Sequence, residues 1–273
     1  MKKLFCFCKV ALISLCGILF ALSFLDCGKT AAFCADGGIG LLTPGVLKVG
    51  VEIGYPPFEF FDDDGTTPIG LDIDLGKAIT KKLGVALTHE DTAWDAIFAG
   101  LGIDKYDCVI SAATINADRA KIVDFTTPYI ENWMSIVVKK GGKEIKSVKE
   151  LEGLSVGFQG ATTADEYLAK QIETGVVSCK VNSYDKVLQC FDDLRLGRID
   201  AVICDSTVSE GYTAKEPDNF AITWHQSTEK GEEAEVFGIA VKKGNAKLLD
   251  ALNKALQELK DSGELDKIIK NWL

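Results

Sequence analysis

The stretch DLGKAITKKLGVALTHE, residues 74–90, contains the change of periodicity that decides the fold class. Leu75, Ile79 and Leu83 recur at helical spacing, which predicts a helix over residues 74–83. Residues 85–90 then predict a strand, and the short apolar run at residues 47–53 predicts another. A helix between two strands is typical of a βαβ unit, so we expect an α/β fold with a parallel sheet flanked by helices.

The same alternation continues in two similar sets, the second of which begins near residue 150. In that set, Ser183 is expected to be the N-cap of a helix. Leu252, Leu256 and Leu259 share one face of a long amphipathic helix near the end of the chain. The remaining expected elements are strands over residues 108–111, 154–158, 178–181, 201–204 and 237–241, and helices over residues 94–101, 163–174, 183–196, 206–214, 245–262 and 265–272.

Two sets of this kind predict two lobes. A strand-like run at residues 133–140 is expected to join them, with a second crossing near residues 230–236. Lobe 1 is then discontinuous, over residues 46–133 and 233–273, and lobe 2 spans residues 134–232. Two crossings would form a hinge about which the lobes move as rigid bodies.

Residues 1–26 have the pattern of an export signal. Lys2 and Lys3 form a basic start, and a mainly apolar run over residues 4–25 follows. The alternative is a retained transmembrane anchor, because the run approaches the roughly 20 residues that span a bilayer. A linker over residues 27–45 separates this leader from the rest of the chain.

Cys27 stands directly after the leader, where a bacterial lipoprotein carries its acylated cysteine and is anchored to the membrane surface. Asp26 is unfavourable before such a cysteine, because a small residue is expected there. Cleavage by an ordinary signal peptidase near residues 30–32 is therefore the alternative. Either route predicts an exported protein, in the periplasm or on the outer face of the cell membrane.

The remaining composition argues against several classes of function. A net charge of −10 without a basic cluster makes nucleic acid an unexpected partner. The chain has two histidines, and its cysteine spacings match no zinc pattern, so we expect neither a metal site nor a cofactor. Cys108 and Cys204 are expected as buried thiols, whereas Cys179 and Cys190 can form a disulfide in an oxidising compartment.

Polar and aromatic side chains follow the predicted strands, where open α/β sheets bind ligands. Arg119 can hold a carboxylate through two parallel hydrogen bonds, but a solvated arginine paired with Asp118 or Asp124 also fits. Asp205 ends an apolar strand and can bind a cation, but it can also cap the next helix. The residues placed in this way are Glu52, Tyr55, Trp94, Ser111, Thr114, Arg119, Thr162, Thr163 and Asp205.

This set contains a fixed cation, fixed carboxylates, hydroxyls and two aromatic rings. An amino acid zwitterion needs such groups, because neither of its charges can be buried unpaired without a large cost. Simpler interpretations remain for some members. Tyr55 and Trp94 can be ordinary core residues, and helix capping alone can explain either Thr162 or Thr163.

Several short motifs occur together along the chain. They are GYPPFEF at residues 54–60, GLDIDL at 70–75, WDAI at 94–97, YDCVIS at 106–111, TI at 114–115 leading to Arg119, VDFTTPY at 123–129, QGATT at 159–163 and GRIDAVICD at 197–205. With these motifs the chain resembles, from about residue 47 to residue 273, the bacterial extracellular solute-binding proteins for polar amino acids. The resemblance implies a two-lobed periplasmic-binding-protein type II fold with a hinge and a ligand cleft between the lobes.

The resemblance also implies roles for the matching residues. Arg119 would hold the ligand α-carboxylate, helped by Thr114 and the N–H of Thr163. Asp205 would bind the α-ammonium, with the carbonyl of Ala112 as a further acceptor. The implied set of ligand-binding residues also contains Gln159, Thr162 and Ser111.

The far end of the ligand would be bound by other residues. Tyr55 and Trp94 would flank its side chain, and Glu52 occupies a place where the family often has an aspartate. Glu52 and Trp94 suit arginine or lysine, and an amide such as glutamine can also donate to Glu52. Two departures leave the specificity open. Ala161 replaces a usual glycine, and Ala112 and Ala113 lie where some members carry a serine.

We therefore expect a monomeric receptor, not an enzyme, that captures a polar L-amino acid and delivers it to the permease subunits of an ABC transporter. Phosphate-binding, serine-hydrolase and metalloprotease motifs are absent from the sequence. One alternative is a cyclohexadienyl-dehydratase-like enzyme on the same fold, with Glu52 as acid or base. Another is the ligand-sensing module of a signalling receptor, although the sequence ends at Leu273 without a kinase or channel.

Overall fold

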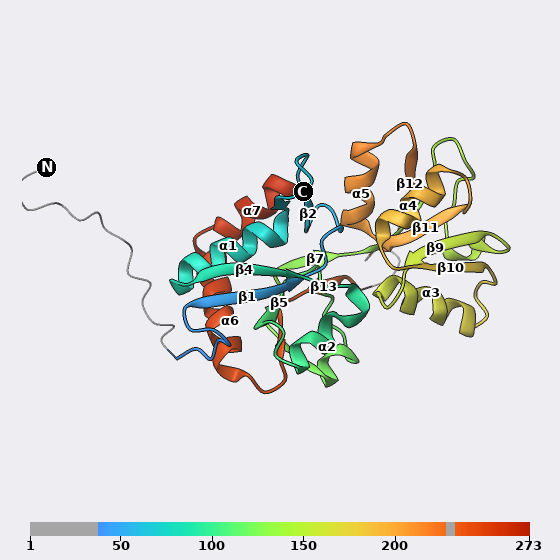
Figure 1. Cartoon of the computed structure of the whole chain (residues 1–273). Helices are drawn as coiled ribbons and strands as arrows, with labels where there is room; N and C mark the ends of the chain where they lie inside the picture. The colour runs from blue at the N-terminus through green and yellow to red at the C-terminus, as the bar shows by residue number, and fades with distance from the viewer. Residues whose placement is uncertain (1–37, 228–232) are drawn as a thin grey trace, which may run out of the picture. The chain divides into compact units, whose positions relative to one another are not determined.

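The computed structural model describes residues 38–227 and 233–273. Cys27 and the predicted export leader lie outside these residues, as does part of the predicted second crossing. Two five-stranded sheets dominate the described part of the chain, and each has helices packed against it (Figure 1). The predicted two-lobed α/β fold is therefore confirmed.

The first sheet is mixed, whereas the sequence predicted a parallel one. Its strand order is β4-β1-β5-β14-β6. The strands β4, β1 and β5 run parallel, and β14 runs antiparallel between β5 and β6. Their bounds are Val46–Val51 for β1, Ala86–Asp91 for β4, Cys108–Val109 for β5, Val123–Phe125 for β6 and Ala240–Lys242 for β14.

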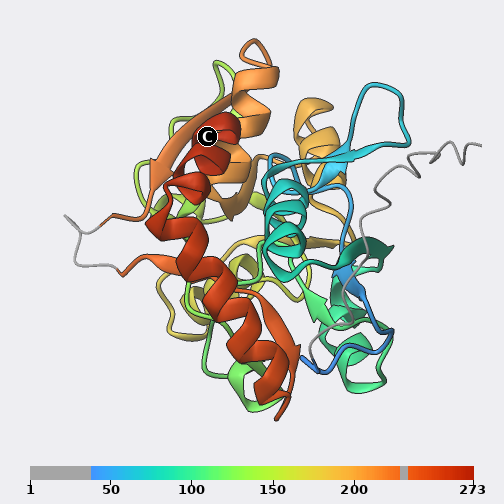
Figure 2. The same cartoon turned by 90° about the vertical axis from the view of Figure 1, so that its left-hand side faces the viewer.

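Helices α1 (Leu71–Leu83), α6 (Ala246–Asp261) and α7 (Glu264–Trp272) pack against one another beside this sheet (Figures 1 and 2). Helix α1 begins three residues before the predicted start at residue 74. Gly70, at φ 131°, turns the chain so that the N–H of Leu71 bonds Pro57 O at 3.0 Å. The start of the helix is therefore set by a tertiary contact, which cannot be predicted from the spacing of its apolar residues.

The helix predicted over residues 94–101 has two parts. A 3-10 turn, η1 (Trp94–Ala96), precedes α2 (Ile97–Gly102). The turn closes through a bond from Ala96 N to Ala93 O at 3.1 Å, a tighter i→i+3 spacing than in an α-helix. This turn places Trp94 at the edge of the lobe.

The second sheet has the order β10-β9-β11-β8-β12. Strands β9, β10 and β11 are parallel, and β8 is antiparallel to both β11 and β12. The edge strand β12 was not predicted, although Phe220, Ile222 and Trp224 alternate with smaller or more polar residues, as in a half-buried strand. The bounds are Met134–Lys139 for β8, Ser155–Gln159 for β9, Lys180–Tyr184 for β10, Ala201–Asp205 for β11 and Phe220–His225 for β12.

The predicted N-cap at Ser183 is wrong. Ser183 lies within β10, where it pairs with Phe158, and helix α4 (Val187–Arg195) begins later. The side chain of Gln189 accepts the N–H of Lys186 at 3.0 Å and so completes the start of that helix. The other helices of this lobe are α3 (Thr163–Glu173) and α5 (Ser206–Lys215), and shorter elements of the chain are η2 (Arg119–Lys121), η3 (Val148–Leu151), β2 (Phe60–Phe61) and β3 (Pro68–Ile69).

A small antiparallel pair, β7 (Ile130–Asn132) and β13 (Glu235–Phe237), carries the chain between the two sheets. The run at residues 133–140, predicted to be the joint, is mostly the inner strand β8 of the second sheet. The strand predicted over residues 237–241 is divided between β13 and β14. Between these two strands, Gly238 N donates to Ala113 O at 3.0 Å and Ile239 N donates to Thr126 Oγ1 at 3.0 Å.

Cys179 and Cys190, for which the sequence left a disulfide open, are both free thiols. Cys190 is buried beside Phe191 in the largest apolar cluster, whereas Cys179 packs against a different cluster. Cys108 and Cys204 are buried thiols, as predicted. Among the described residues, no helix is long and apolar enough to cross a membrane.

Two glycines of α2 provide a matched test of packing. A Cβ at Gly100 would lie 2.1 Å from the buried Tyr106 hydroxyl, whereas a Cβ at Gly102 would meet no atom within 4 Å. We expect Gly100→Ala to lower the free energy of unfolding by about 1–3 kcal/mol, because a packed core does not absorb an added methyl group. Thermal denaturation of both variants measures this difference. Equal melting temperatures for Gly100→Ala and Gly102→Ala would contradict the packing described.

Candidate functional site

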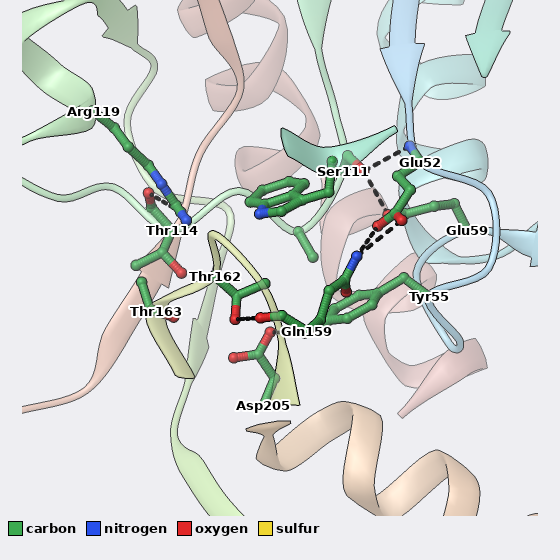
Figure 3. A pocket seen from close by; sticks show the side chains of 12 residues that line it. Glu52, Tyr55, Glu59, Ser111, Thr114, Arg119, Gln159, Thr162, Thr163 and Asp205 are labelled. Atoms are coloured by element: carbon green, nitrogen blue, oxygen red, sulfur yellow. Dashed lines mark hydrogen bonds between the residues drawn. The ribbon is translucent and has the colours of Figure 1, made fainter. Parts of the chain in front are cut away.

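All eleven predicted site residues line one pocket, although they come from widely separated segments (Figure 3). Most stand at or just after the carboxyl ends of β1, β5, β9 and β11, because parallel strands bring these ends to one edge of each sheet. The pocket is lined by Glu52, Tyr55, Trp94, Ser111, Ala112, Thr114, Arg119, Gln159, Thr162, Thr163 and Asp205, and also by Glu59.

Arg119 provides a buried positive charge at one end of the pocket. Its side chain is 7% exposed and donates to Thr114 O at 3.0 Å and to Ala161 O at 3.4 Å. Its guanidinium carbon lies 5.1 Å from the centre of the Trp94 ring and 5.3 Å from that of Phe98. Such cation–π contacts favour the charged form, whereas burial lowers the pKa of the guanidinium.

The alternative of a solvated Arg119 is excluded by these contacts. Asp118 pairs with Lys121, and Asp124 pairs with Lys243 at 2.7 Å. Within residues 38–227 and 233–273, Arg119 forms no ion pair with a carboxylate. Its charge is therefore available to an anion that enters the pocket.

Glu235 approaches the same end of the pocket and was not predicted from the sequence. Its Oε2 accepts from the hydroxyls of Thr114 and Thr163 at 3.1 and 3.0 Å. Each hydroxyl has a single proton, so an anion bound there would compete with Glu235 for it. Glu235 lies in an acidic run, a pattern that does not distinguish a pocket residue from a surface one.

Asp205 is a buried carboxylate in the middle of the pocket, 6% exposed. It accepts from the Tyr55 hydroxyl at 2.5 Å and from Asn132 Nδ2 at 2.7 Å. Burial raises its pKa to about 7, and the charge of Glu235 adds to the shift. Asp205 stands at the N-cap position of α5, but no N–H of that helix bonds its side chain, so capping does not account for the carboxylate. Asn132 was not predicted, because it lies 73 residues before Asp205.

Glu52 and Gln159 form the opposite end of the pocket, as seen in Figure 3. Gln159 Nε2 donates to both carboxylate oxygens of Glu52, at 2.9 and 2.8 Å. Burial raises the pKa of Glu52, which is 4% exposed, to about 7. The buried Oε1 of Gln159 has no donor among the described residues. This end of the pocket therefore presents acceptors to any side chain that enters it.

Ser111, Ala112 and Glu59 form the wall beside Glu52. Ser111 Oγ accepts the N–H of Glu52 at 3.0 Å and donates to Glu59 Oε1 at 2.6 Å. Ala112 has a positive φ of 44°, an uncommon conformation for a residue with a Cβ. Glu59 was not predicted as a site residue, although it belongs to the GYPPFEF motif.

The turn before α3 links the two lobes across the pocket. The indole Nε1 of Trp94 donates to Ala161 O at 2.9 Å, the same carbonyl that Arg119 contacts. Ala161 has φ 59°, so an alanine here adopts the conformation that a glycine adopts without strain. Thr162 caps α3, accepting from Asp165 N at 3.4 Å, which matches the capping interpretation for one of the two threonines.

The arrangement suits a molecule with three separate polar groups. A buried cation with two hydroxyls lies at one end, a carboxylate lies in the middle, and acceptors lie at the other end. A carboxylate, an ammonium and a hydrogen-bond donor of the ligand would each meet an opposite partner.

Comparison with known proteins places the chain in a family. Residues 47–273 match the family model of bacterial extracellular solute-binding proteins, family 3. The L-cystine-binding protein TcyJ of Escherichia coli K12 is 35% identical over 229 residues, covering 84% of this chain and 82% of that protein. The ABC transporter arginine-binding protein 1 of the same strain is 35% identical over 242 residues, covering 89% and 96%.

Solved structures are similar as well. An ancestral arginine-binding protein bound to arginine has a TM-score of 0.78 and 41% identity, and the match covers 84% of this chain and 98% of that chain. The ancestral amino acid-binding protein AncCDT-1, described as a precursor of cyclohexadienyl dehydratase, has a TM-score of 0.75 and 33% identity, with 84% and 95% covered. The chain belongs to the bacterial extracellular solute-binding proteins of family 3.

Proposed function

We propose that this protein is the receptor of an ABC importer and captures a polar L-amino acid with a basic or amide side chain. The observation that carries the proposal is the separation of a buried guanidinium, a buried carboxylate and a set of buried acceptors along one pocket. Relatives that bind cystine and arginine support the class of ligand.

The α-carboxylate of the ligand would bind Arg119, Thr114 and Thr163 at the start of α3. Arg119 is held in place by backbone carbonyls and aromatic rings, so little entropy is lost when it binds. Asp205 would bind the α-ammonium, with the carbonyl of Ala112 beside it. Asp205 would ionise in the complex, since an adjacent cation lowers the pKa of a carboxyl group.

The ligand side chain would pass Tyr55 and Trp94 to reach Glu52 and Gln159. A guanidinium or ammonium would satisfy the charge of Glu52, and the free Oε1 of Gln159 would accept a further N–H. A glutamine side chain would supply fewer donors. The acceptor-rich end therefore favours arginine or lysine over an amide.

Contacts from both lobes would couple binding to movement. Lobe 1 would comprise residues 46–133 and 233–273 and lobe 2 residues 134–232, with β7 and β13 as the hinge. Ligand contacts from both lobes would favour a closed form, which would dock on the permease subunits. We further propose that the protein acts outside the cell membrane as a monomer, after export by its leader, with Cys27 as a lipid anchor.

An enzyme on this fold is the competing function. The similarity to a precursor of cyclohexadienyl dehydratase and the pKa of about 7 at Glu52 suit acid–base chemistry. Incubating the pure protein with cyclic acid substrates separates the two possibilities, because a receptor returns its ligand unchanged. A role as the sensing module of a signalling receptor would use the same pocket and differ only in the partner.

The first test is calorimetric titration of the refolded protein, stripped of bound ligand, with the twenty amino acids, ornithine, citrulline and cystine. We expect saturable one-to-one binding of a basic or amide amino acid. Arg119→Ala should weaken that binding by several kcal/mol, because the ligand carboxylate loses its charged partner in a buried site. Arg198→Ala, at an exposed arginine, is the matched control. Near-native affinity of Arg119→Ala for every ligand would disprove the assigned site.

The ionisation of Glu52 leads to a second prediction, which concerns the pH dependence of ligand affinity. Because its pKa is about 7, Glu52 gains charge between pH 6 and pH 8. A cationic ligand binds the ionised form, so arginine affinity relative to the uncharged analogue citrulline should rise by about tenfold over this range. The ratio cancels the ionisation of Asp205, which both ligands contact through their α-ammonium groups.

Glu52→Gln should abolish this pH dependence and weaken arginine more than citrulline. Glu173→Gln, at an exposed glutamate at the end of α3, is the control. An arginine-to-citrulline ratio that stays constant from pH 6 to pH 8 in the wild type would show that Glu52 does not bind the ligand charge.

A further inference from the structure

Two carboxyl groups lie fully buried, Glu59 in the pocket wall and Asp72 beside it. Glu59 and Asp72 are each 1% exposed. Glu59 is held by a backbone bond from Tyr55 N to Glu59 O at 2.8 Å, and Asp72 is in the first turn of α1. The other titratable or charged groups acting on the pair are Glu52 and Tyr129, and neither supplies a positive charge.

Each carboxyl has one bonded oxygen and one oxygen without a donor. Ser111 Oγ donates to Glu59 Oε1 at 2.6 Å. Ala112 N and the Tyr129 hydroxyl donate to Asp72 Oδ2 at 2.7 and 3.0 Å. The other oxygens, Glu59 Oε2 and Asp72 Oδ1, are buried and have no donor among the described residues. Two buried acceptors without donors are costly, and two adjacent negative charges without a cation are costlier still.

One proton between the two free oxygens removes both problems. The protonated carboxyl donates to the ionised one, so neither oxygen is left without a partner. Burial raises the pKa of both groups. Asp72 accepts two hydrogen bonds, from Ala112 N and the Tyr129 hydroxyl, whereas Glu59 accepts one, from Ser111. The negative charge is therefore better stabilised on Asp72, and Glu59 is the group that keeps the proton.

The pair is bonded to the part of the chain that forms the pocket wall. Asp72 holds the N–H of Ala112, whose φ of 44° turns the chain after β5. Glu59 accepts a hydrogen bond from the Ser111 hydroxyl, which leaves the Ser111 oxygen to accept the N–H of Glu52. These bonds fix the direction of the Ala112 carbonyl and the position of Glu52.

We propose that Glu59 and Asp72 share a single proton, and that this pair positions the Ser111–Ala112 segment and Glu52 in the pocket. The shared proton is inferred from the burial and hydrogen bonds of the two carboxyl groups and does not depend on the proposed function. The positioning of ligand contacts rests on the function proposed above.

A double-mutant cycle tests the shared proton. In Glu59→Gln, the amide oxygen accepts from Ser111 and the amide nitrogen donates to Asp72 Oδ1, as the protonated acid does. In Asp72→Asn, the oxygen accepts from Ala112 and Tyr129 and the nitrogen donates to Glu59. In the double variant, the donors fix both amide oxygens, so two NH₂ groups face each other without an acceptor.

We expect each single variant to melt within about 3 °C of the wild type at pH 7, and the double variant to lose at least about 5 °C more than the sum of the two. Additive changes would overturn the proposal. So would a single variant that fails to fold, because each amide copies the hydrogen bonds of the one-proton pair.

The pH dependence of stability supplies an independent measurement. In the unfolded chain both carboxyls ionise near pH 4, whereas the folded pair keeps its proton to a higher pH. Its contribution to stability is therefore complete below about pH 4 and is lost as pH rises through the raised pKa of the pair. Between pH 5 and pH 8, the melting temperature of either single variant should fall less steeply than that of the wild type. Parallel curves would overturn the proposal.

Arginine titrations test the positioning role. At pH 7 we expect each single variant to bind arginine within about threefold of the wild type, and the folded double variant to lose more than tenfold. From pH 7 to pH 9.5, wild-type affinity should fall relative to Glu59→Gln, because only the wild-type pair has a proton to lose. An unchanged ratio would overturn the positioning role. If the wild type binds no amino acid, the proposed function fails, while the melting measurements still decide the shared proton.

Discussion

The buried guanidinium of Arg119 is the charge around which one end of the pocket is built. It needs acceptors, and it obtains them from the carbonyls of Thr114 and Ala161, which belong to different lobes. Trp94 stacks on the same guanidinium and donates to the same carbonyl of Ala161. A change in any of these groups would disturb the other contacts, since all three share one small volume. Ala161 has a positive φ, a conformation that is unfavourable for a residue with a Cβ, and in this conformation its carbonyl faces both donors.

Negative charge is handled differently along the same cleft. Asp205 is bonded by two neutral donors, Glu52 by an amide, and Glu59 and Asp72 by hydroxyl or backbone groups. None of these carboxyls forms an ion pair within the described residues. Their pKa values are raised by burial, so their charge responds to what binds beside them. The protein therefore keeps acidic groups near neutrality in a place where an incoming cation would ionise them.

Much of this arrangement could be predicted from the sequence, and what could not has a common cause. Strand ends marked Glu52, Ser111 and Asp205 correctly as neighbours, because parallel strands bring their carboxyl ends together whatever the loops do. Asn132 and Glu235 were missed, because each bonds a pocket residue from the crossing strands, whose positions depend on contacts more than 70 residues apart. The predicted start of α1 was three residues late and the predicted end of β10 was three residues early, for the same reason. The spacing of apolar residues indicates which face of a helix or strand is buried. It does not indicate the residue at which a tertiary contact starts or ends that element.

The place of β14 in the first sheet has a consequence for how the protein is made. This strand, residues 240–242, lies between β5 and β6, so an inner position of that sheet is filled by a segment that comes long after β6 in the sequence. The second sheet uses only residues 134–225 and has all its strands much earlier. During synthesis the first lobe therefore remains an incomplete sheet with an open interior position until the ribosome has passed residue 242. A chain with such a late closing strand stays partly unstructured while it is still being made, which is the condition in which an unfolded polypeptide can be threaded through a translocation pore.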